Sequence, residues 1–203
     1  ATVTATDTDD NSATQDITVN VTNVNDNNPV FTSNSIFSVA ENETAIGTAT
    51  ATDADGDDIT FSVSGSELSI TSAGVLTFAS APDYETKTSY SATVTASDGT
   101  NSTTQDITVN VTNVNDVAPE FTSAATFSAA ENQTSIGTVT ATDAEGDSVT
   151  FTVSGSELEI TSAGVLTFAS APDYETKTSY TATVTASDGT NSTTQDITVN
   201  VTN

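Results

Sequence analysis

The sequence predicts an all-β protein built of tandem seven-stranded Greek-key β-sandwiches joined by short linkers. Three observations predict this fold. Apolar and polar residues alternate with a period of two, glycines and prolines interrupt the alternation at short intervals, and the whole pattern returns after 90 residues. Such alternation, with a Thr-rich outer side, is typical of antiparallel sheets with one buried and one solvated face. No stretch has the 3.6-residue period of an amphipathic helix.

The internal repeat defines the expected domains. The string NVND occurs at 23–26 and again at 113–116, and residues 27–113 match residues 117–203 at 71 of 87 positions. Residues 1–26 match the end of the same unit. We therefore expect the last two strands of a preceding repeat at 1–26, a full repeat at 27–116 and another at 117–203, in a window cut from a longer array.

Seven strands are expected within one repeat. Their ranges in chain order are near 31–40, 46–52, 58–64, 68–71, 75–79, 89–97 and 103–112. In the last range Ile107, Val109 and Val111 alternate with Thr and Asn, as in a strand with one buried face. The apolar residues expected in the core of this repeat are Phe31, Phe37, Val39, Ile59, Phe61, Leu68, Leu76, Phe78, Tyr90, Val94, Ile107, Val109 and Val111.

The composition excludes several classes of function. The chain has 28 Asp and Glu against 2 Lys and Arg, and it has no His, Cys, Met or Trp. Without His or Cys, the usual catalytic triads and zinc–thiolate sites cannot form. A net charge of −26 disfavours nucleic acid and anionic membrane surfaces as partners. Paired carboxylates can catalyse glycoside hydrolysis, but near-identical tandem copies do not favour an enzyme, and we expect none.

The acidic residues fall into short motifs that occur in the same order in both repeats. The first repeat has AEN at 40–42, DAD at 53–55, PDYE at 82–85, SDG at 97–99 and NVND at 113–116; the second has AEN at 130–132, DAE at 143–145, PDYE at 172–175 and SDG at 187–189. Together these motifs resemble the cadherin repeat over essentially the whole chain. The resemblance implies a cadherin-like fold in which the linker between two repeats holds three Ca²⁺ ions.

The same resemblance implies the ligands of about three Ca²⁺ at the 113–117 linker. From the upstream repeat these are Glu41, Asp83, Glu85, Asn113 and Asp116 with the carbonyl of Val114, and from the downstream repeat Asn115, Asp143, Glu145 and Asp188 with the carbonyl of Val117. The chemistry is suitable, because Ca²⁺ takes six to eight oxygens from carboxylates, amides and backbone carbonyls. Seven carboxylates also nearly balance the charge of three divalent ions.

A smaller site, with one or more Ca²⁺, is expected at the 23–27 linker. The residues that match the ligand motifs there are Asn23, Asn25, Asp26 and Asn27 with Asp53, Asp55 and Asp98. The upstream AEN and PDYE acids have no counterpart before this linker. Three departures from the family pattern are Asn in place of the first Asp of each linker, Val117 in place of Asn, and Glu145 in place of the second Asp of the DxD motif. Acids outside the motifs, such as those at 57, 58 and 147, are expected to be solvated turn residues.

These observations predict a calcium-rigidified extracellular segment that acts in cell-surface adhesion or as a structural fibre or stalk. Micromolar intracellular Ca²⁺ would not fill weak sites, which favours the cell surface, and highly similar repeats without Cys are typical of a bacterial surface protein. The expected partners are adjacent identical repeats, together with a homophilic partner, another cell-surface partner or a glycan. We expect this segment to contact neither nucleic acid nor a membrane. The alternative is a carbohydrate-binding module, with Tyr84 and Tyr174 as candidate aromatic residues; a passive spacer or filament also remains open.

Overall fold

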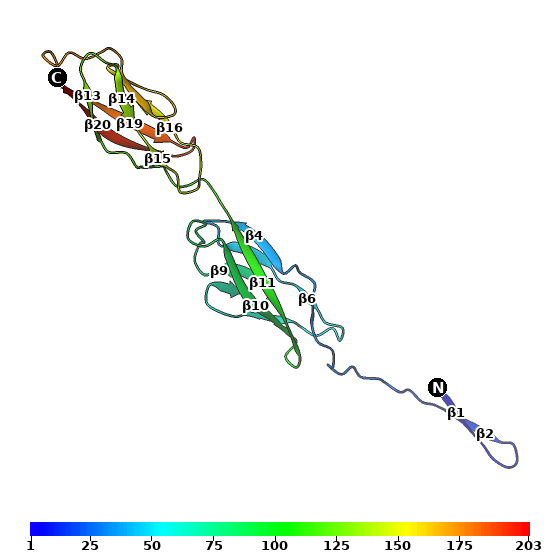
Figure 1. Ribbon diagram of the computed structural model, residues 1–203. Helices are drawn as coiled ribbons and strands as arrows, with labels where there is room; N and C mark the ends of the chain where they lie inside the picture. The colour runs from blue at the N-terminus through cyan, green and yellow to red at the C-terminus, as the bar shows by residue number, and fades with distance from the viewer. The chain divides into compact units, whose positions relative to one another are not determined.

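The computed structural model describes residues 1–203 and consists of strands, turns and extended connections (Figure 1). It contains no helix, so no helix is present that could cross a membrane. A short N-terminal hairpin precedes two sets of nine strands, β3 to β11 and β12 to β20, that follow the same order. The prediction of an all-β protein is confirmed.

The strand bounds recur at the 90-residue spacing of the sequence. The hairpin consists of β1 (Thr2–Thr6) and β2 (Ser12–Asp16). The first set consists of β3 (Val30–Phe31), β4 (Ile36–Ala40), β5 (Ala45–Thr48), β6 (Ala51–Thr52), β7 (Thr60–Val63), β8 (Leu68–Ile70), β9 (Val75–Phe78), β10 (Ser89–Ser97) and β11 (Ser102–Thr112). The second set consists of β12 (Glu120–Phe121), β13 (Thr126–Ala130), β14 (Ser135–Thr138), β15 (Ala141–Thr142), β16 (Thr150–Val153), β17 (Leu158–Ile160), β18 (Val165–Phe168), β19 (Ser179–Ser187) and β20 (Ser192–Thr202).

The chain forms two compact units whose boundary does not follow the sequence repeat. The first unit comprises Ala1–Phe37, Thr44–Ser80 and Tyr90–Asn110, and the second comprises Ser38–Glu43, Ala81–Ser89 and Val111–Asn203. The AEN, PDYE and NVND motifs at 40–42, 82–85 and 113–116 therefore belong to the second unit, together with the whole of the second strand set.

The second strand set shows how a repeat is built. Strands β13, β20, β19 and β16 form one sheet in that order, β14, β18 and β17 form another, and β12 pairs with β15. β13 runs parallel to β20, whereas β19 is antiparallel to both β20 and β16. The first set has the same three sheets, with the orders β4-β11-β10-β7, β5-β9-β8 and β3-β6. The tandem sandwich architecture predicted from the sequence is thus confirmed.

The period-two alternation places the core. In β20, Ile197, Val199 and Val201 are at most 4% exposed, while Asp196 and Asn200 face solvent. Burial of such a side chain contributes roughly 1.5–3 kcal/mol. In the first set the expected core residues that are buried are Val39, Leu68, Leu76, Phe78, Val94, Ile107, Val109 and Val111, whereas Phe31, Phe37, Ile59, Phe61 and Tyr90 are half-buried.

Two of the seven expected strands are each divided in the structure. The range 31–40 forms β3 and β4, and the range 46–52 forms β5 and β6. In the second set the corresponding β12 pairs with β15, whereas β13 joins β20 in the other sheet. The amides of Thr122 and Ser123 both donate to the carbonyl of Thr140 (2.9 and 3.2 Å) where the chain changes sheets. Each repeat therefore has nine strands in place of the expected seven, because the chain crosses between sheets in an extended conformation that keeps the alternation.

The N-terminal hairpin is paired from Thr2↔Asp16 to Thr6↔Ser12. Ile17 continues the pairing by one residue, since its amide donates to the carbonyl of Ala1 at 2.8 Å. The second strand expected in the 1–26 segment is therefore present only as far as Asp16, and residues 17–22 lie outside any strand.

Candidate metal centre

Four carboxylates from separate segments meet within the second unit. Oxygen atoms of Glu41, Glu85, Asp116 and Glu145 all lie within 4.8 Å of one another. Glu41 follows β4, Glu85 lies in the turn after Pro82, Asp116 follows β11 and Glu145 follows β15. The AEN, PDYE, NVND and DAE motifs therefore each place one acid in this group, which we call the linker acid group.

Glu41 fixes the linker to the PDYE turn. Its side chain is 3% exposed, and its two oxygens accept hydrogen bonds from the amides of Tyr84 and Val114, both at 2.8 Å. A buried carboxylate is costly unless it is hydrogen-bonded, and two amide donors supply that compensation. The amide of Glu41 in turn donates to the carbonyl of Thr112 at 3.1 Å. This side chain is thus a structural anchor as well as a member of the linker acid group.

Glu145 holds the other side of the linker. Its two oxygens accept from the amides of Asp116 and Val117, each at 3.1 Å. At the corresponding place in the first unit, a single oxygen of Asp55 accepts from both Asp26 (3.0 Å) and Asn27 (2.9 Å). With its extra methylene, Glu145 therefore accepts the two amide hydrogen bonds on separate oxygens, and its side chain still belongs to the linker acid group.

The electrostatics of the linker acid group favour a cation. Four carboxylates lie close together, and no Lys or Arg lines the adjoining cavity of about 450 Å³. Partial desolvation, reinforced by the charges of Glu41, Glu145 and Asp83, raises the pKa of Glu85 above its usual range. The group therefore has an unbalanced negative charge that a divalent ion would relieve.

A second acid group shares Glu145 with the first. Oxygens of Asp143, Glu145 and Asp147 lie within 4.8 Å of one another. Asp143 accepts from the amide of Glu145 through Oδ1 (3.0 Å), while its Oδ2 is buried without a hydrogen-bond partner. Asp147 was expected to be a solvated turn residue, and the sequence signal that could have revealed it is its spacing of two residues after Glu145.

The remaining expected ligands of this linker lie around these groups. Asp83 lines the same cavity as Glu41 and Asp116, and the hydroxyl of Thr86, at 2.9 Å, lowers its pKa. Asp188 accepts from the amide of Asn191 at 2.6 Å, and its Oδ2 is buried without a partner. The side chain of Asn191 donates to Asn115 Oδ1 at 2.7 Å. Asn113 is exposed, and the side chain of Asn115 donates to Asp147 at 2.8 Å.

The 23–27 linker in the first unit carries a smaller acid group. Oxygens of Asp53, Asp55 and Asp57 lie within 4.8 Å of one another. The amide of Asn27 lowers the pKa of Asp55, and the amide of Asn101 lowers that of Asp98. Other contacts of the expected ligands are those of Asn23 with the carbonyl of Asp55 (3.0 Å), Asn101 with Asn25 (2.9 Å) and Asn27 with Asp26 (3.1 Å). Asp26 is exposed and lies outside the acid group, and no glutamate contributes here.

A third acid group lies at the far end of the second strand set. Oxygens of Glu131, Asp173 and Glu175 lie within 4.8 Å of one another. Glu131 accepts from the amide of Tyr174 at 3.1 Å, and the side chain of Asn203 donates to Glu175 at 3.3 Å. At the 90-residue offset, the counterparts of these residues in the preceding repeat are Glu41, Asp83, Glu85 and Asn113. The upstream half of the acid arrangement therefore recurs.

Comparison with known proteins identifies the class of fold. A family model described as "Bacterial Ig domain" matches residues 25–112, less than half of the chain. The chain is 34% identical over 199 residues to human "Cadherin EGF LAG seven-pass G-type receptor 2" and 34% identical over 226 residues to the Drosophila melanogaster "Protocadherin-like wing polarity protein stan". These alignments cover 87% and 94% of this chain but only 7% and 6% of the two relatives.

Solved structures give the same result. The first two extracellular repeats of human protocadherin-24 superpose with a TM-score of 0.75 at 21% identity, over 89% of this chain and 99% of that one, which shows the fold alone. Repeats EC1–4 of Drosophila N-cadherin give a TM-score of 0.71 at 25% identity, over 86% of this chain and 49% of that one. Sequence relatives and solved structures agree, so the chain is composed of cadherin-like domains.

Proposed function

We propose that the acid groups around residues 113–117 bind Ca²⁺ and that the bound ions stiffen the connection between two cadherin-like repeats. The single observation that carries this proposal is the meeting of four carboxylates from four distant segments within 4.8 Å. Mutual repulsion would drive these side chains apart without a compensating cation. The donor set consists of oxygens alone, as a hard cation such as Ca²⁺ prefers.

The residues present fit such an ion. The carboxylate oxygens Asp143 Oδ2 and Asp188 Oδ2 are buried and have no hydrogen-bond partner, which is expensive unless a cation balances them. Glu41, Glu85, Asp116 and Glu145 would supply further oxygens, and Asp83, Asn113 and Asn115 with the carbonyls of Val114 and Val117 complete the set we propose for about three ions. Mg²⁺ fits less well, because it demands tight octahedral geometry and keeps several waters.

Calcium would act on stability through mass action. An ion that binds only the ordered linker stabilises it by about 2.7 kcal/mol when its concentration is a hundred times its dissociation constant. The backbone amides of residues 114, 116 and 117 already donate hydrogen bonds to the carboxylates of Glu41 and Glu145, which hold the linker in place. The ions would therefore lock an arrangement that this chain's own side chains have partly formed.

The same reasoning extends to the domain organisation. We propose that residues 27–116 and 117–203 are consecutive repeats and that residues 1–26 are the closing segment of a preceding one. The 23–27 linker would hold fewer ions than the 113–117 linker, one or more, because only Asp53, Asp55 and Asp57 come together there. Asn23, Asn25, Asn27, Asp26 and Asp98 would complete that weaker site.

In the cell surface context of its relatives, we propose that the segment acts in adhesion or as a stalk rather than in catalysis. Adjacent repeats are the immediate partners, and a homophilic or other cell-surface partner would bind the larger protein. The carbohydrate-binding alternative lacks a supporting observation, because Tyr84 is half-buried beside Glu41 and Tyr174, 36% exposed, lies in a separate turn.

A thermal melt with and without Ca²⁺ tests the calcium proposal. Glu41→Gln removes one charge from the linker acid group and should abolish most of the calcium-dependent rise in melting temperature. The matched control is Glu43→Gln, two residues away and exposed, because the second repeat carries Gln133 at this position and tolerates it. An unchanged calcium response in Glu41→Gln, or no calcium response in the unaltered chain, would contradict the assignment.

A further inference from the structure

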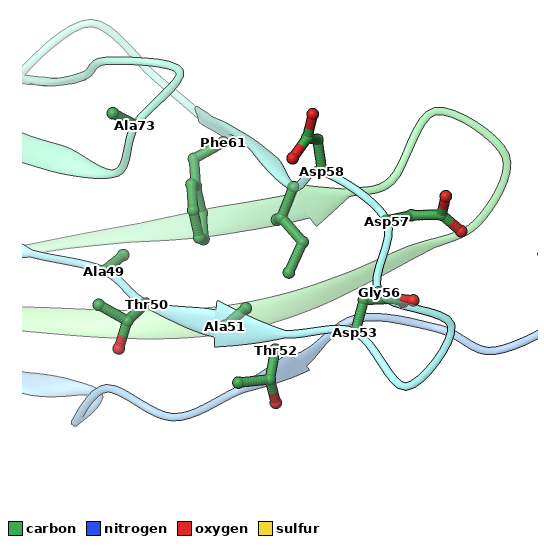
Figure 2. A pocket seen from close by; sticks show the side chains of 11 residues that line it. Ala49, Thr50, Ala51, Thr52, Asp53, Gly56, Asp57, Asp58, Phe61 and Ala73 are labelled. Carbon is green, nitrogen blue, oxygen red and sulfur yellow. The ribbon is translucent and has the colours of Figure 1, made fainter.

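The AEN turn places an asparagine where the backbone has a left-handed conformation. Asn42 has a φ of 65°, and its counterpart Asn132 in the second repeat has a φ of 61°. Glycine adopts this conformation without steric cost, and the chain uses it at Gly56, in the turn that carries Asp53 and Asp57 (Figure 2). Asparagine tolerates the left-handed region less well than glycine does. The AEN turn therefore accepts some backbone strain at a position where glycine would supply no side chain.

Asn42 connects the AEN turn to two other motifs of the 113–117 linker. Its backbone amide donates to the carbonyl of Pro82, in the PDYE motif, at 2.9 Å. Its side-chain Nδ2 donates to Asp116 Oδ2, in the NVND motif, at 2.5 Å, and a hydrogen bond to a carboxylate is charge-assisted. Asp116 is a member of the linker acid group. The side chain of Asn42 therefore holds one of the four carboxylates of that group from a turn 74 residues earlier in the chain.

The 23–27 linker holds its aspartate in a different way. There the side chain of Asn27 donates both to Asp26 (3.1 Å) and to Asp55 (3.0 Å). The residue that matches Asn27 at the 90-residue offset is Val117, which has no side-chain donor. The donor to Asp116 comes from the AEN turn instead of from the linker. This difference accompanies the different places of the two aspartates, since Asp116 lies in the linker acid group and Asp26 lies outside the acid groups.

We propose that Asn42 is a positioning residue for the calcium site: its side-chain amide keeps the carboxylate of Asp116 beside those of Glu41 and Glu85 before an ion arrives. This inference rests on the proposed calcium function. Like charges repel, so without this donor the exposed side chain of Asp116 would turn toward solvent. A ligand that is already held in place loses less conformational freedom on binding, and donors that orient metal-binding carboxylates raise metal affinity in this way. Asn42 itself would not touch the ion.

The second repeat supplies a matched control for the test. The backbone amide of Asn132 donates to the carbonyl of Pro172 at 2.9 Å, as that of Asn42 does to Pro82. The position that would match Asp116 is 206, which is not part of this 203-residue chain. Asn42→Gly and Asn132→Gly therefore remove the same side chain from the same kind of turn, and glycine keeps the left-handed backbone in both. Both variants should melt at the same temperature in calcium-free buffer.

Calcium titration of the 203-residue chain, followed by the backbone amide NMR signals of Asp116 and Val117, measures affinity at this linker. Asn42→Gly should weaken calcium binding about fivefold, less than the tenfold or more that is typical of such donors, because this hydrogen bond is exposed. Asn132→Gly should leave the affinity unchanged. Equal affinity in Asn42→Gly and the unaltered chain would overturn this proposal and leave calcium binding intact. No calcium-dependent shift in the unaltered chain would contradict the calcium proposal, and this inference with it.

A measurement without calcium tests the hydrogen bond itself. Asp116→Ala removes the acceptor, so it should shift the side-chain amide NMR signals of Asn42 and leave those of Asn132 in place. A role for Asn42 in the backbone of the turn alone would not produce this shift, because the amide bond to Pro82 is kept. Unshifted side-chain signals of Asn42 would overturn the proposal whatever the calcium affinity.

Discussion

The chain contains nearly the same 15 residues in two very different settings. Residues 12–26 and 102–116 differ only in Ala13 against Thr103. In the first copy Ile17, Val19 and Val21 are 44%, 83% and 93% exposed, and in the second copy the corresponding Ile107, Val109 and Val111 are 1%, 0% and 4% exposed. The second copy is a continuous strand of 11 residues, whereas the first forms a strand of only 5. Alternation makes a strand possible, and neighbouring strands make it form.

The acidic end of the two copies differs in the same way. Asp116 joins the linker acid group with Glu41, Glu85 and Glu145, and Asn42 donates to its Oδ2 at 2.5 Å. Asp26 lies outside the acid groups and accepts from the side chain of Asn27 at 3.1 Å. The NVND string is therefore not a metal site by itself. It becomes part of one where the AEN and PDYE turns of a complete repeat meet it.

Supplying the strands that the first copy lacks should produce the largest effect, a gain in hydrogen-exchange protection. Fusing a copy of residues 27–91 before Ala1 supplies every strand that precedes the matching position, Ala92, in the intact repeat. Residues 17–22 should then form a strand, and their amides should gain hydrogen-exchange protection that approaches the global stability of a domain, about 5–15 kcal/mol. Fusing the same residues in scrambled order is the control. Rapid exchange at 17–22 in the ordered fusion would show that the first copy is not a repeat end.

A charge placed in the two copies should have opposite consequences. Val109→Asp buries an unpaired carboxylate at a fully buried position and should destabilise its unit by more than about 4 kcal/mol. Val19→Asp changes an exposed side chain and should alter stability by less than about 0.5 kcal/mol. Urea denaturation followed by circular dichroism measures both. Comparable losses in the two variants would mean that residues 17–22 are packed in solution.

The parts of the structure that the sequence could predict are those governed by local pattern. Alternation located the strands, and the resemblance of the acidic motifs to the cadherin repeat implied that Glu41, Glu85, Asp116 and Glu145 belong to one linker; their oxygens lie within 4.8 Å of one another. The division of the ranges 31–40 and 46–52 could not be read from the sequence, because a strand that changes sheets keeps its alternation. The recruitment of Asp147 depends on how the turn after β15 folds back, and an acid in a glycine turn is ordinarily solvated. The exposure of residues 17–22 depends on partner strands and on no property of those residues.

The smallest expected effect is the opposite pH dependence of the two linkers without calcium. The pKa of Glu85 is raised, chiefly by desolvation, so its stabilising contribution is full below the ordinary glutamate pKa and is lost as pH rises through the raised value. The pKa of Asp55 is lowered, chiefly by the amide of Asn27, so its contribution is full above the ordinary aspartate pKa and is lost as pH falls through the lowered value. Urea denaturation in calcium-free buffer should show that Glu85→Gln reduces the loss of unfolding free energy as the pH rises toward neutral. Asp55→Asn should reduce the loss of unfolding free energy as the pH falls into the acid range. Because both carboxylates are near solvent, each change should be small. A neutral-pH loss of stability in Glu85→Gln would reverse the sign and show that this carboxylate is held by donors rather than crowded by like charges.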